Sequence, residues 1–317
     1  MIGLPFVYLL TGLFLAFTAL RVLRRSGPPR RWTSAVFWGL LALAFLAGDR
    51  LPAAVMGGIV LVLALLAGLG GVRATPEAAA DPAELQKEST RLGNRLFLPA
   101  LAIPLLTLAG VLGLKWVVLP SGPLLDPANA TLASLGLACL AALSVALWVT
   151  RDRPLRALGE GSRLLETIGW AAILPLYLAA LGTVFAKAGV GEVVAALLKG
   201  GLPLGSRIAA VIAYGSAMAL LSFVMGNAFA AFPVVTAGIG LPILVGVHHA
   251  NPAAMAAMGM LTGYCGTLLS PMAANYNLVP AALLELKDPN GVIRAQAPTA
   301  FILFGVNLAL MNFLIFR

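Results

Sequence analysis

The chain alternates between long apolar runs and short polar connections from one end to the other. A helix that spans the hydrocarbon core of a bilayer needs about 20 mostly apolar residues. The pattern therefore predicts an all-α polytopic membrane protein with about 8–11 transmembrane or half-membrane helices. The expected segments are 4–20, 33–47, 51–72, 96–119, 130–150, 168–186, 208–225, 234–247, 252–269, 272–284 and 298–316.

Two stretches interrupt this pattern inside a charge-free region, because no Lys, Arg, Asp or Glu occurs within 208–284. The stretches 226–233 and 266–277 carry glycines, prolines, amides and hydroxyls, and the runs 234–247 and 272–284 are too short to span. Short, interrupted apolar segments are typical of the discontinuous helices of transporters. Polar backbone at membrane depth is tolerated where it is buried in protein or lines a cavity. We therefore expect broken helices, with at least one re-entrant hairpin, to meet at a binding site.

The composition also indicates a membrane protein, and it changes how the positive net charge is interpreted. Of 317 residues, 60% are hydrophobic and 10% are charged, whereas about 25% of the residues in a soluble domain are charged. A net charge of +9 would suggest nucleic acid in a soluble protein. Here the basic residues lie in connections facing the lipid bilayer surface, so no nucleic-acid partner is expected. Cys139 and Cys265 are expected as core residues, and no metal site is expected.

The basic residues predict the orientation of the chain. They follow the first, third and fifth apolar runs, and the intervening connections carry few. By the positive-inside rule, the N-terminus is expected on the periplasmic side of a bacterial cytoplasmic membrane. No basic residue precedes the first apolar run, so a cleavable signal peptide is not expected. The three clusters are Arg21, Arg24, Arg25, Arg30 and Arg31; Arg73, Lys87, Arg91 and Arg95; and Arg151, Arg153, Arg156 and Arg163.

The pattern of the connections divides the chain into two parts. Residues 1–163 are expected to form an N-terminal scaffold of about five helices. It includes a cytoplasmic amphipathic segment at 74–94, with Asp81 as the N-cap of its helix. Residues 164–317 are expected to form a transport core that holds both breaks. A short amphipathic piece at 193–198 precedes the first break.

The breaks themselves predict a site for a small anion. Ser270 and Pro271 form a local helix start, while Asn227 ends one helix and Pro233 restarts another. A helix N-terminus exposes unpaired amides and carries roughly half a positive charge, so two such ends would hold a carboxylate without Lys or Arg. Unwound carbonyls beside Asn, Ser and Thr oxygens would suit Na⁺ as a coupling ion, and no other cofactor is expected. The candidate substrate- and ion-binding residues are Asn227, Thr267, Ser270, Asn275 and Asn277.

Five further residues are secondary candidates with a competing structural interpretation. Asn, Ser and Thr in membrane helices often only bond to a neighbouring helix, and this is the preferred interpretation of Ser222 and Thr236. Tyr264 and Tyr276 either line the cavity or pack against other side chains. Glu166 is expected in the first turn of the sixth helix, where an acid stabilises the helix dipole.

At its two breaks the sequence resembles the ion-transporter superfamily, which includes the dicarboxylate and citrate carriers. The similar elements are Gly226-Asn227-Ala228 and 267–277. The resemblance implies two re-entrant hairpins and two broken helices, related by an inverted repeat, that meet at the binding site. Breaks in that superfamily carry motifs of the Ser-Asn-Thr type, and the first break here lacks the flanking hydroxyls.

Over most of its length the chain is similar to an uncharacterised bacterial membrane family. The motif runs from Gly263-Tyr264-Cys265-Gly266-Thr267 through Pro271-Met272-Ala273-Ala274-Asn275 to Leu284-Glu285-Leu286-Lys287-Asp288. Members are typically encoded beside a second, smaller membrane protein and often beside genes of 5-oxoproline breakdown. The resemblance implies a half-transporter whose partner supplies the other repeat. It also implies a small anionic substrate such as 5-oxoproline, and it leaves homo-dimerisation of the pair open.

The leading hypothesis is a subunit of a secondary active transporter for a small organic anion, coupled to Na⁺ or H⁺, and not an enzyme. One alternative is a non-transporting subunit that assembles or stabilises a membrane complex. The other is an intramembrane hydrolase that uses Ser270 with His248 or His249 as its base. The proline that follows Ser270 suits a helix cap better than the turn that holds a nucleophile.

Overall fold

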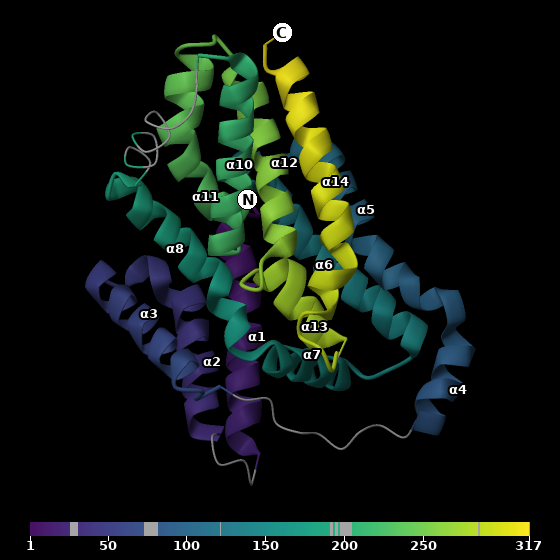
Figure 1. The fold of residues 1–317 in the computed structure, drawn as a ribbon. Helices are drawn as coiled ribbons and strands as arrows, with labels where there is room; N and C mark the ends of the chain where they lie inside the picture. Colours follow the sequence, from purple (N-terminus) through teal and green to yellow (C-terminus); the bar gives the residue numbers. More distant parts are fainter. Residues whose placement is uncertain are drawn as a thin grey trace. The chain divides into compact units, whose positions relative to one another are not determined.

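The computed structural model describes residues 1–25, 31–72, 82–120, 122–190, 193, 196, 205–284 and 286–316 (Figure 1). Asp81 and most of 193–198 lie outside the described residues, as do Arg30 and Arg73. Contacts divide the chain into two compact units, Met1–Gly169 and Trp170–Arg317, which are described separately below.

The chain is an all-α polytopic membrane protein, as the apolar pattern predicts. Within the described residues, seven helices are long and apolar enough to cross a membrane, or eight if one bent helix pair counts as a span. A shorter apolar helix, α3 (Ala53–Gly68), accompanies them. Within the described residues, the β-structure is a two-residue antiparallel pairing of β1 (Val118–Leu119) with β2 (Gly122–Pro123) and an isolated bridge between Ile2 and Leu125.

The first unit is built mainly from two helix pairs, in which α1 packs against α2 and α5 against α6. The hydroxyls of Thr33 and Ser34 on α2 donate to the carbonyl of Gly71, which ties the end of α3 to α2. The helices are α1 (Leu4–Arg24), α2 (Arg31–Ala47), α3, α4 (Pro82–Leu92), α5 (Phe97–Gly113), α6 (Ala130–Thr150) and α7 (Pro154–Ile168). The position 163, expected at the end of the scaffold, lies inside α7.

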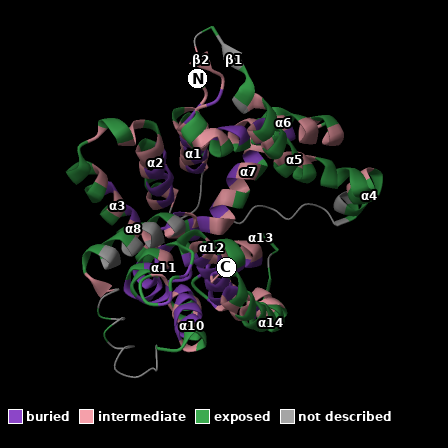
Figure 2. Cartoon of the chain, turned by 90° about the horizontal axis from the view of Figure 1, so that it is seen from above, coloured by how far each residue is buried: buried purple, intermediate pink, exposed green. Residues whose placement is uncertain are grey.

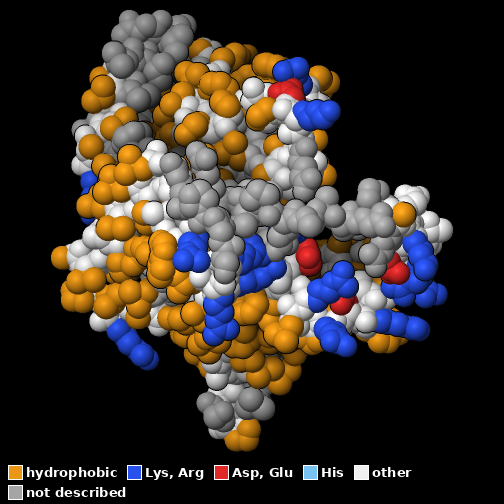
Figure 3. Space-filling model, turned by 90° about the horizontal axis from the view of Figure 1, so that it is seen from below, with side chains coloured by type: hydrophobic (Ala, Val, Ile, Leu, Met, Phe, Trp, Pro, Cys, Tyr) orange, Lys and Arg blue, Asp and Glu red, His pale blue; other side chains and the backbone are white. Residues whose placement is uncertain are grey.

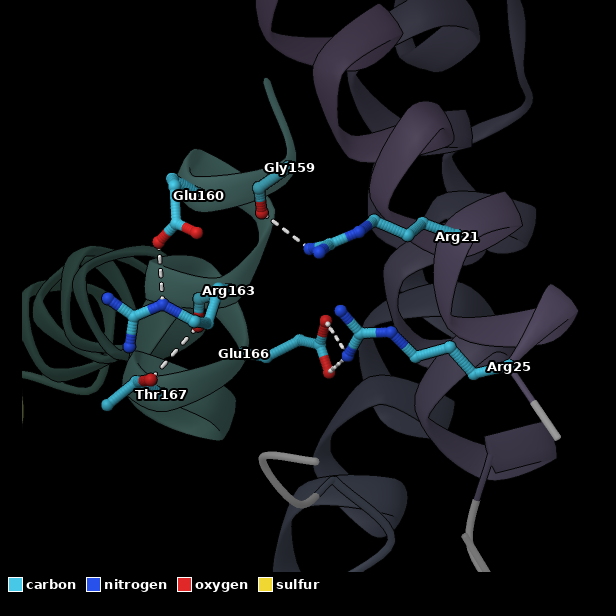
Figure 4. A network of polar contacts seen from close by, with 7 residues as sticks. All are labelled: Arg21, Arg25, Gly159, Glu160, Arg163, Glu166 and Thr167. Carbon is cyan, nitrogen blue, oxygen red and sulfur yellow. Dashed lines mark hydrogen bonds and ion pairs between the residues drawn. The ribbon is translucent and has the colours of Figure 1, made fainter. Parts of the chain in front are cut away.

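The prediction for Glu166 is wrong about its place in a helix. Glu166 lies in the last turn of α7, an extra amphipathic helix before the next apolar one, and not in a first turn. A carboxylate near a helix C-terminus is disfavoured by the dipole. Arg25 compensates, because its Nη1 lies 3.2 Å from Oε1 of Glu166, which is only 3% exposed (Figure 4). Glu166 is therefore stabilised by an ion pair with Arg25, and not by the dipole of a helix N-terminus as the sequence suggested.

The second unit surrounds a buried core formed mainly by α10, α12 and the π-helix η6, which continues α11 (Figure 2). Its largest buried side chains include Tyr214, Met218, Ile239 and Met255. The expected short run at 234–247 is instead part of an 18-residue apolar helix, because α11 begins earlier and continues without interruption. The elements are α8 (Leu174–Lys187), α10 (Arg207–Met225), α11 (Ala228–Val235), the π-helix η6 (Thr236–Val245), α12 (Pro252–Leu269), the π-helix η7 (Ala274–Leu278), α13 (Val279–Leu283) and α14 (Gly291–Leu314).

Glycines on one face of α12 allow α10 to approach closely. A Cβ added to Gly266 would overlap the carbonyl oxygen of Ala219, and one added to Gly259 would overlap the ring of Tyr214. One added to Gly263 would lie 3.0 Å from Oγ of Ser222. Small residues at such spacing let membrane helices pack backbone to backbone. The helices that lead into the two breaks are therefore held in direct contact.

We predict that Gly266→Ala destabilises the protein, because its new Cβ meets rigid backbone rather than a movable side chain. Overpacking of this kind costs about 1–3 kcal/mol of unfolding free energy. The measurement is the thermal unfolding midpoint of the purified protein in detergent. Gly305→Ala on α14 is the matched control, since its Cβ would meet nothing within 4 Å. Equal midpoints for the two variants would contradict the close approach of α10 and α12.

Candidate functional site

The first break separates α10 from α11 by two residues. Gly226 closes α10 with a φ of 67°, in the left-handed region that glycine adopts without strain. Asn227 is extended, and its Oδ1 accepts a hydrogen bond from the amide of Phe229 at 2.8 Å. The helix therefore restarts at Ala228. The expected restart at Pro233 is wrong, because that proline lies inside α11, which continues past it into the wider π-helix η6.

The second break follows α12 and is longer. Ser270 is the C-cap of α12 with φ −80° and ψ 126°, and its Oγ accepts the amide of Met272 at 3.1 Å. The expected helix start at Ser270 and Pro271 is therefore wrong, since the helix resumes only at Ala274 in η7. The two arms of this broken element are bent by 53°. Pro271 is the second residue of a turn that the amide of Ala273 closes on the carbonyl of Ser270, and it does not open a helix.

The carbonyl end of α12 is closed by two amide side chains. Nδ2 of Asn277 donates to the carbonyls of Ser270 at 2.6 Å, Leu268 at 3.2 Å and Thr267 at 3.4 Å. Gln296 from α14 donates to the carbonyl of Leu268 at 3.0 Å and also to Oδ1 of Asn277. Sequence reasoning missed Gln296, whose signal was an amide in the early turns of a mainly apolar helix. Asn277 is thus engaged in holding the break.

The two breaks meet at one cavity of about 220 Å³. Gly226 makes this possible, because a Cβ there would lie 2.6 Å from the carbonyl group of Met272 in the other break. The lining residues are Gly226, Asn227, Ala228 and Phe229 from the first break; Tyr264 and Thr267 from α12; and Ala274, Asn275 and Tyr276 from the second. None of these side chains carries a formal charge.

Backbone amides give this uncharged cavity a positive character. Ala228, Ala274, Asn275 and Tyr276 line the cavity, and among the described residues no hydrogen bond occupies their backbone amides. They belong to the first turns of α11 and η7, so two helix N-termini open on the same space. Each N-terminus carries roughly half a positive charge from its unpaired amides. The cavity is therefore suited to an anion.

Aromatic rings form one wall of the cavity. The ring centroids of Phe229 and Tyr264 lie 6.1 Å apart at 72°, and those of Tyr264 and Tyr276 lie 6.1 Å apart at 42°. Such edge and tilted arrangements leave ring faces available to an apolar part of a ligand. The cavity thus combines amide donors with an apolar aromatic wall.

The structure brings together only part of the predicted site. Asn227, Thr267 and Asn275 line the cavity with Tyr264 and Tyr276. Ser270 and Asn277 are buried and do not line it. Their binding roles stay predictions, but their bonds are those of helix caps.

The other secondary candidates lie away from the cavity. The hydroxyl of Thr236 bonds to that of Tyr214 at 3.1 Å, as expected for a contact between helices. Ser222 is fully buried, and its Oγ makes no hydrogen bond within the described part of the chain. Glu166 belongs to the first unit. His248 is buried beside the Phe316 ring, and no cluster of three His, Cys, Asp or Glu residues suited to a metal occurs among the described residues.

Comparison with known proteins identifies a family whose description gives no function. A family model described as "Protein of unknown function (DUF979)" matches residues 5–316, which is nearly the whole chain. Searches of curated proteins and of solved structures find no match. Functional inference therefore starts from the geometry of the cavity.

We predict that Asn277→Leu destabilises the protein while Asn275→Leu does not. The first change removes the hydrogen bonds from Asn277 to the end of α12 and takes away the acceptor of Gln296 in a buried site, which costs about 1–3 kcal/mol. Asn275 is exposed and makes no side-chain hydrogen bond within the described residues, so the same substitution there breaks none. Chemical or thermal unfolding in detergent measures both. Equal loss of stability in the two variants would contradict the capping role of Asn277.

Proposed function

We propose, from the premise that the chain belongs to the DUF979 family, that it is a subunit of a secondary active transporter for a small organic anion. The chain is a membrane-embedded protein, and the family description assigns it no activity. The observation that supports transport is the meeting of two helix N-termini at one cavity, where the broken pair of α12 and η7 meets the start of α11 and, among the described residues, four amides are unpaired. Discontinuous helices with N-termini aimed at anionic groups are a recurring way to build transporter sites.

The proposed substrate is a small carboxylate, for which 5-oxoproline is the first compound to test. A cavity of about 220 Å³ is smaller than the roughly 300–1,000 Å³ of pockets for drug-sized ligands. The amides of Ala274, Asn275 and Tyr276 would bind the carboxylate, as N–H groups at helix N-termini do for other anions. The rings of Tyr264 and Phe229 would pack against the less polar part of the solute. The choice of 5-oxoproline itself derives from the family resemblance and not from these contacts.

Na⁺ or H⁺ is the proposed coupling ion, with the neutral oxygens at the cavity as Na⁺ ligands. Oγ1 of Thr267 donates to the carbonyl of Gly263 at 3.2 Å, which leaves its lone pairs free to accept. The side-chain oxygen of Asn275 is exposed at the cavity. Oxygen ligands of this kind suit a hard cation.

A second, smaller membrane protein is the proposed partner. In transporters built from inverted repeats, the substrate lies between the repeats, and each repeat contributes a broken element. In the described part of this chain, both breaks lie in the second unit and line the same cavity. The partner would supply the opposing repeat and close the cavity from its other side.

We predict that Ala274→Pro lowers uptake because it removes one of the unpaired amides. Ala274 is the first residue of η7, where proline is tolerated. Ala273 before it has φ −74° and ψ 101°, which is extended and outside the helical region that is disfavoured before proline. A hydrogen bond to a charged group is worth about 1.5–3 kcal/mol, so uptake at low solute concentration should fall about tenfold or more. The assay is uptake of labelled 5-oxoproline and dicarboxylates into vesicles that hold this chain with its partner.

Ala274→Gly is the matched control, because it changes the same side chain and keeps the amide. We expect it to retain most of the uptake. Full uptake by Ala274→Pro would contradict binding at this helix end. Absence of carboxylate uptake and of carboxylate-dependent stabilisation in the intact, folded pair would favour the assembly subunit instead.

A further inference from the structure

The C-terminal end of α1 carries three arginines beside apolar side chains. Arg21, Arg24 and Arg25 are spaced i, i+3 and i+4, which places them on one side of the helix. They line a cavity of about 440 Å³ together with Phe17, Leu20 and Leu155. Leu155 lies at the start of α7, so two helices of the first unit form the cavity. Figure 3 shows the wider setting, in which Lys and Arg side chains lie among hydrophobic ones.

Hydrogen bonds to α7 fix two of these arginines. Nη1 of Arg21 donates to the carbonyl of Gly159 at 2.5 Å, and Nη1 of Arg25 donates to both carboxylate oxygens of Glu166 at 3.2 and 3.3 Å (Figure 4). Fixed guanidinium groups lose less conformational entropy when they bind a ligand. The cavity is therefore pre-organised by the contact between α1 and α7.

The charge that remains available at this cavity is that of Arg24. Arg25 is already paired with Glu166 of α7. The other acid on α7, Glu160, is engaged with Arg163 at 2.8 Å. Arg24 is exposed, and within the described residues it has no acidic partner. An anion can therefore bind at Arg24 without displacing an existing ion pair.

The apolar part of the cavity distinguishes between kinds of anion. Leu20 is 53% exposed and Leu155 is 75% exposed, and Phe17 lies one turn before Arg21 on α1. A soluble phosphate would use the guanidinium groups and leave these side chains uncovered. An amphiphile with a phosphate and an acyl chain would use both parts. Basic pockets beside membrane helices are suited to anionic lipid headgroups.

We propose that Arg21, Arg24 and Arg25 bind the phosphate of an anionic phospholipid whose acyl chain lies along Phe17 and Leu20. The site lies at the end of α1 that the arginine distribution predicts to face the cytoplasm, at the level of lipid headgroups. Arginine is suited to phosphate because its guanidinium donates two parallel hydrogen bonds. The bound lipid joins α1 to α7 and so stabilises the first unit.

The test is the thermal unfolding midpoint of the full chain in neutral detergent, with phosphatidylglycerol, phosphatidylcholine or inorganic phosphate added. We expect phosphatidylglycerol at about 100 times its dissociation constant to raise the midpoint by roughly 5 °C. Phosphatidylcholine and inorganic phosphate should raise it far less. Equal shifts with both lipids would overturn the proposal, and so would a full shift with phosphate alone.

Arg24→Gln tests the site itself, because Arg24 is exposed and its loss breaks no ion pair within the described residues. We expect it to lose at least half of the phosphatidylglycerol shift. Arg50→Gln makes the same charge change at another exposed position of the first unit and should keep the shift. Native mass spectrometry should find fewer bound phosphatidylglycerol molecules on Arg24→Gln than on Arg50→Gln. Equal shifts or equal lipid counts in the two variants would show that only net charge matters and would overturn the proposal.

Discussion

The structure of the second unit depends on how it satisfies backbone groups where membrane helices are broken. Hydrocarbon offers no hydrogen bonds, so a break must find partners in the protein or in a cavity. At the end of α12 the carbonyls find Asn277 and Gln296. Ala228, Ala274, Asn275 and Tyr276 line the cavity, and among the described residues their backbone amides have no such partners. The carbonyls are closed and these four donors are left open, which supports the proposal that the cavity takes an anion.

Close packing brings the two breaks together. Gly266 admits the backbone of α10 against α12, and Gly226 admits the backbone around Met272 against the end of α10. Each contact needs the absence of a side chain at one position. Larger residues there would separate the helices and widen the distance between their N-termini. Because the field of a helix end falls off within about one turn, the two N-termini act on one ligand only at this close approach.

The sequence predicted the membrane class, the break after α12 and part of the cavity, because charge-free apolar runs interrupted by Gly, Pro and Asn are local signals. Gly226 and Asn227 instead join two helices that are each long enough to span a membrane. Sequence reasoning failed where a distant residue decides. Ser270 has the local chemistry of a helix start but closes α12, since its carbonyl meets the side chain of Asn277. Glu166 has the chemistry of an N-terminal acid but pairs with Arg25, 141 residues away. An amphipathic helix such as α7 carries too many charges to stand out from a polar connection by hydropathy alone.

The neutral character of the cavity and the charged end of α1 follow from one energetic rule. A guanidinium group at the centre of a bilayer costs about 2.5–3.5 kcal/mol on insertion scales, and more on an isolated helix. If the binding site of a carrier contained an Arg, the protein would have to return through the membrane without substrate while that positive charge had no counter-charge. Helix amides attract an anion through partial charges that are part of the backbone, so the empty site carries no net charge. Arg21, Arg24 and Arg25 instead lie at a helix end, where phosphate groups and water can surround them. On the two proposals, the second unit binds an anion through backbone amides, and the first unit binds a lipid phosphate through arginine side chains.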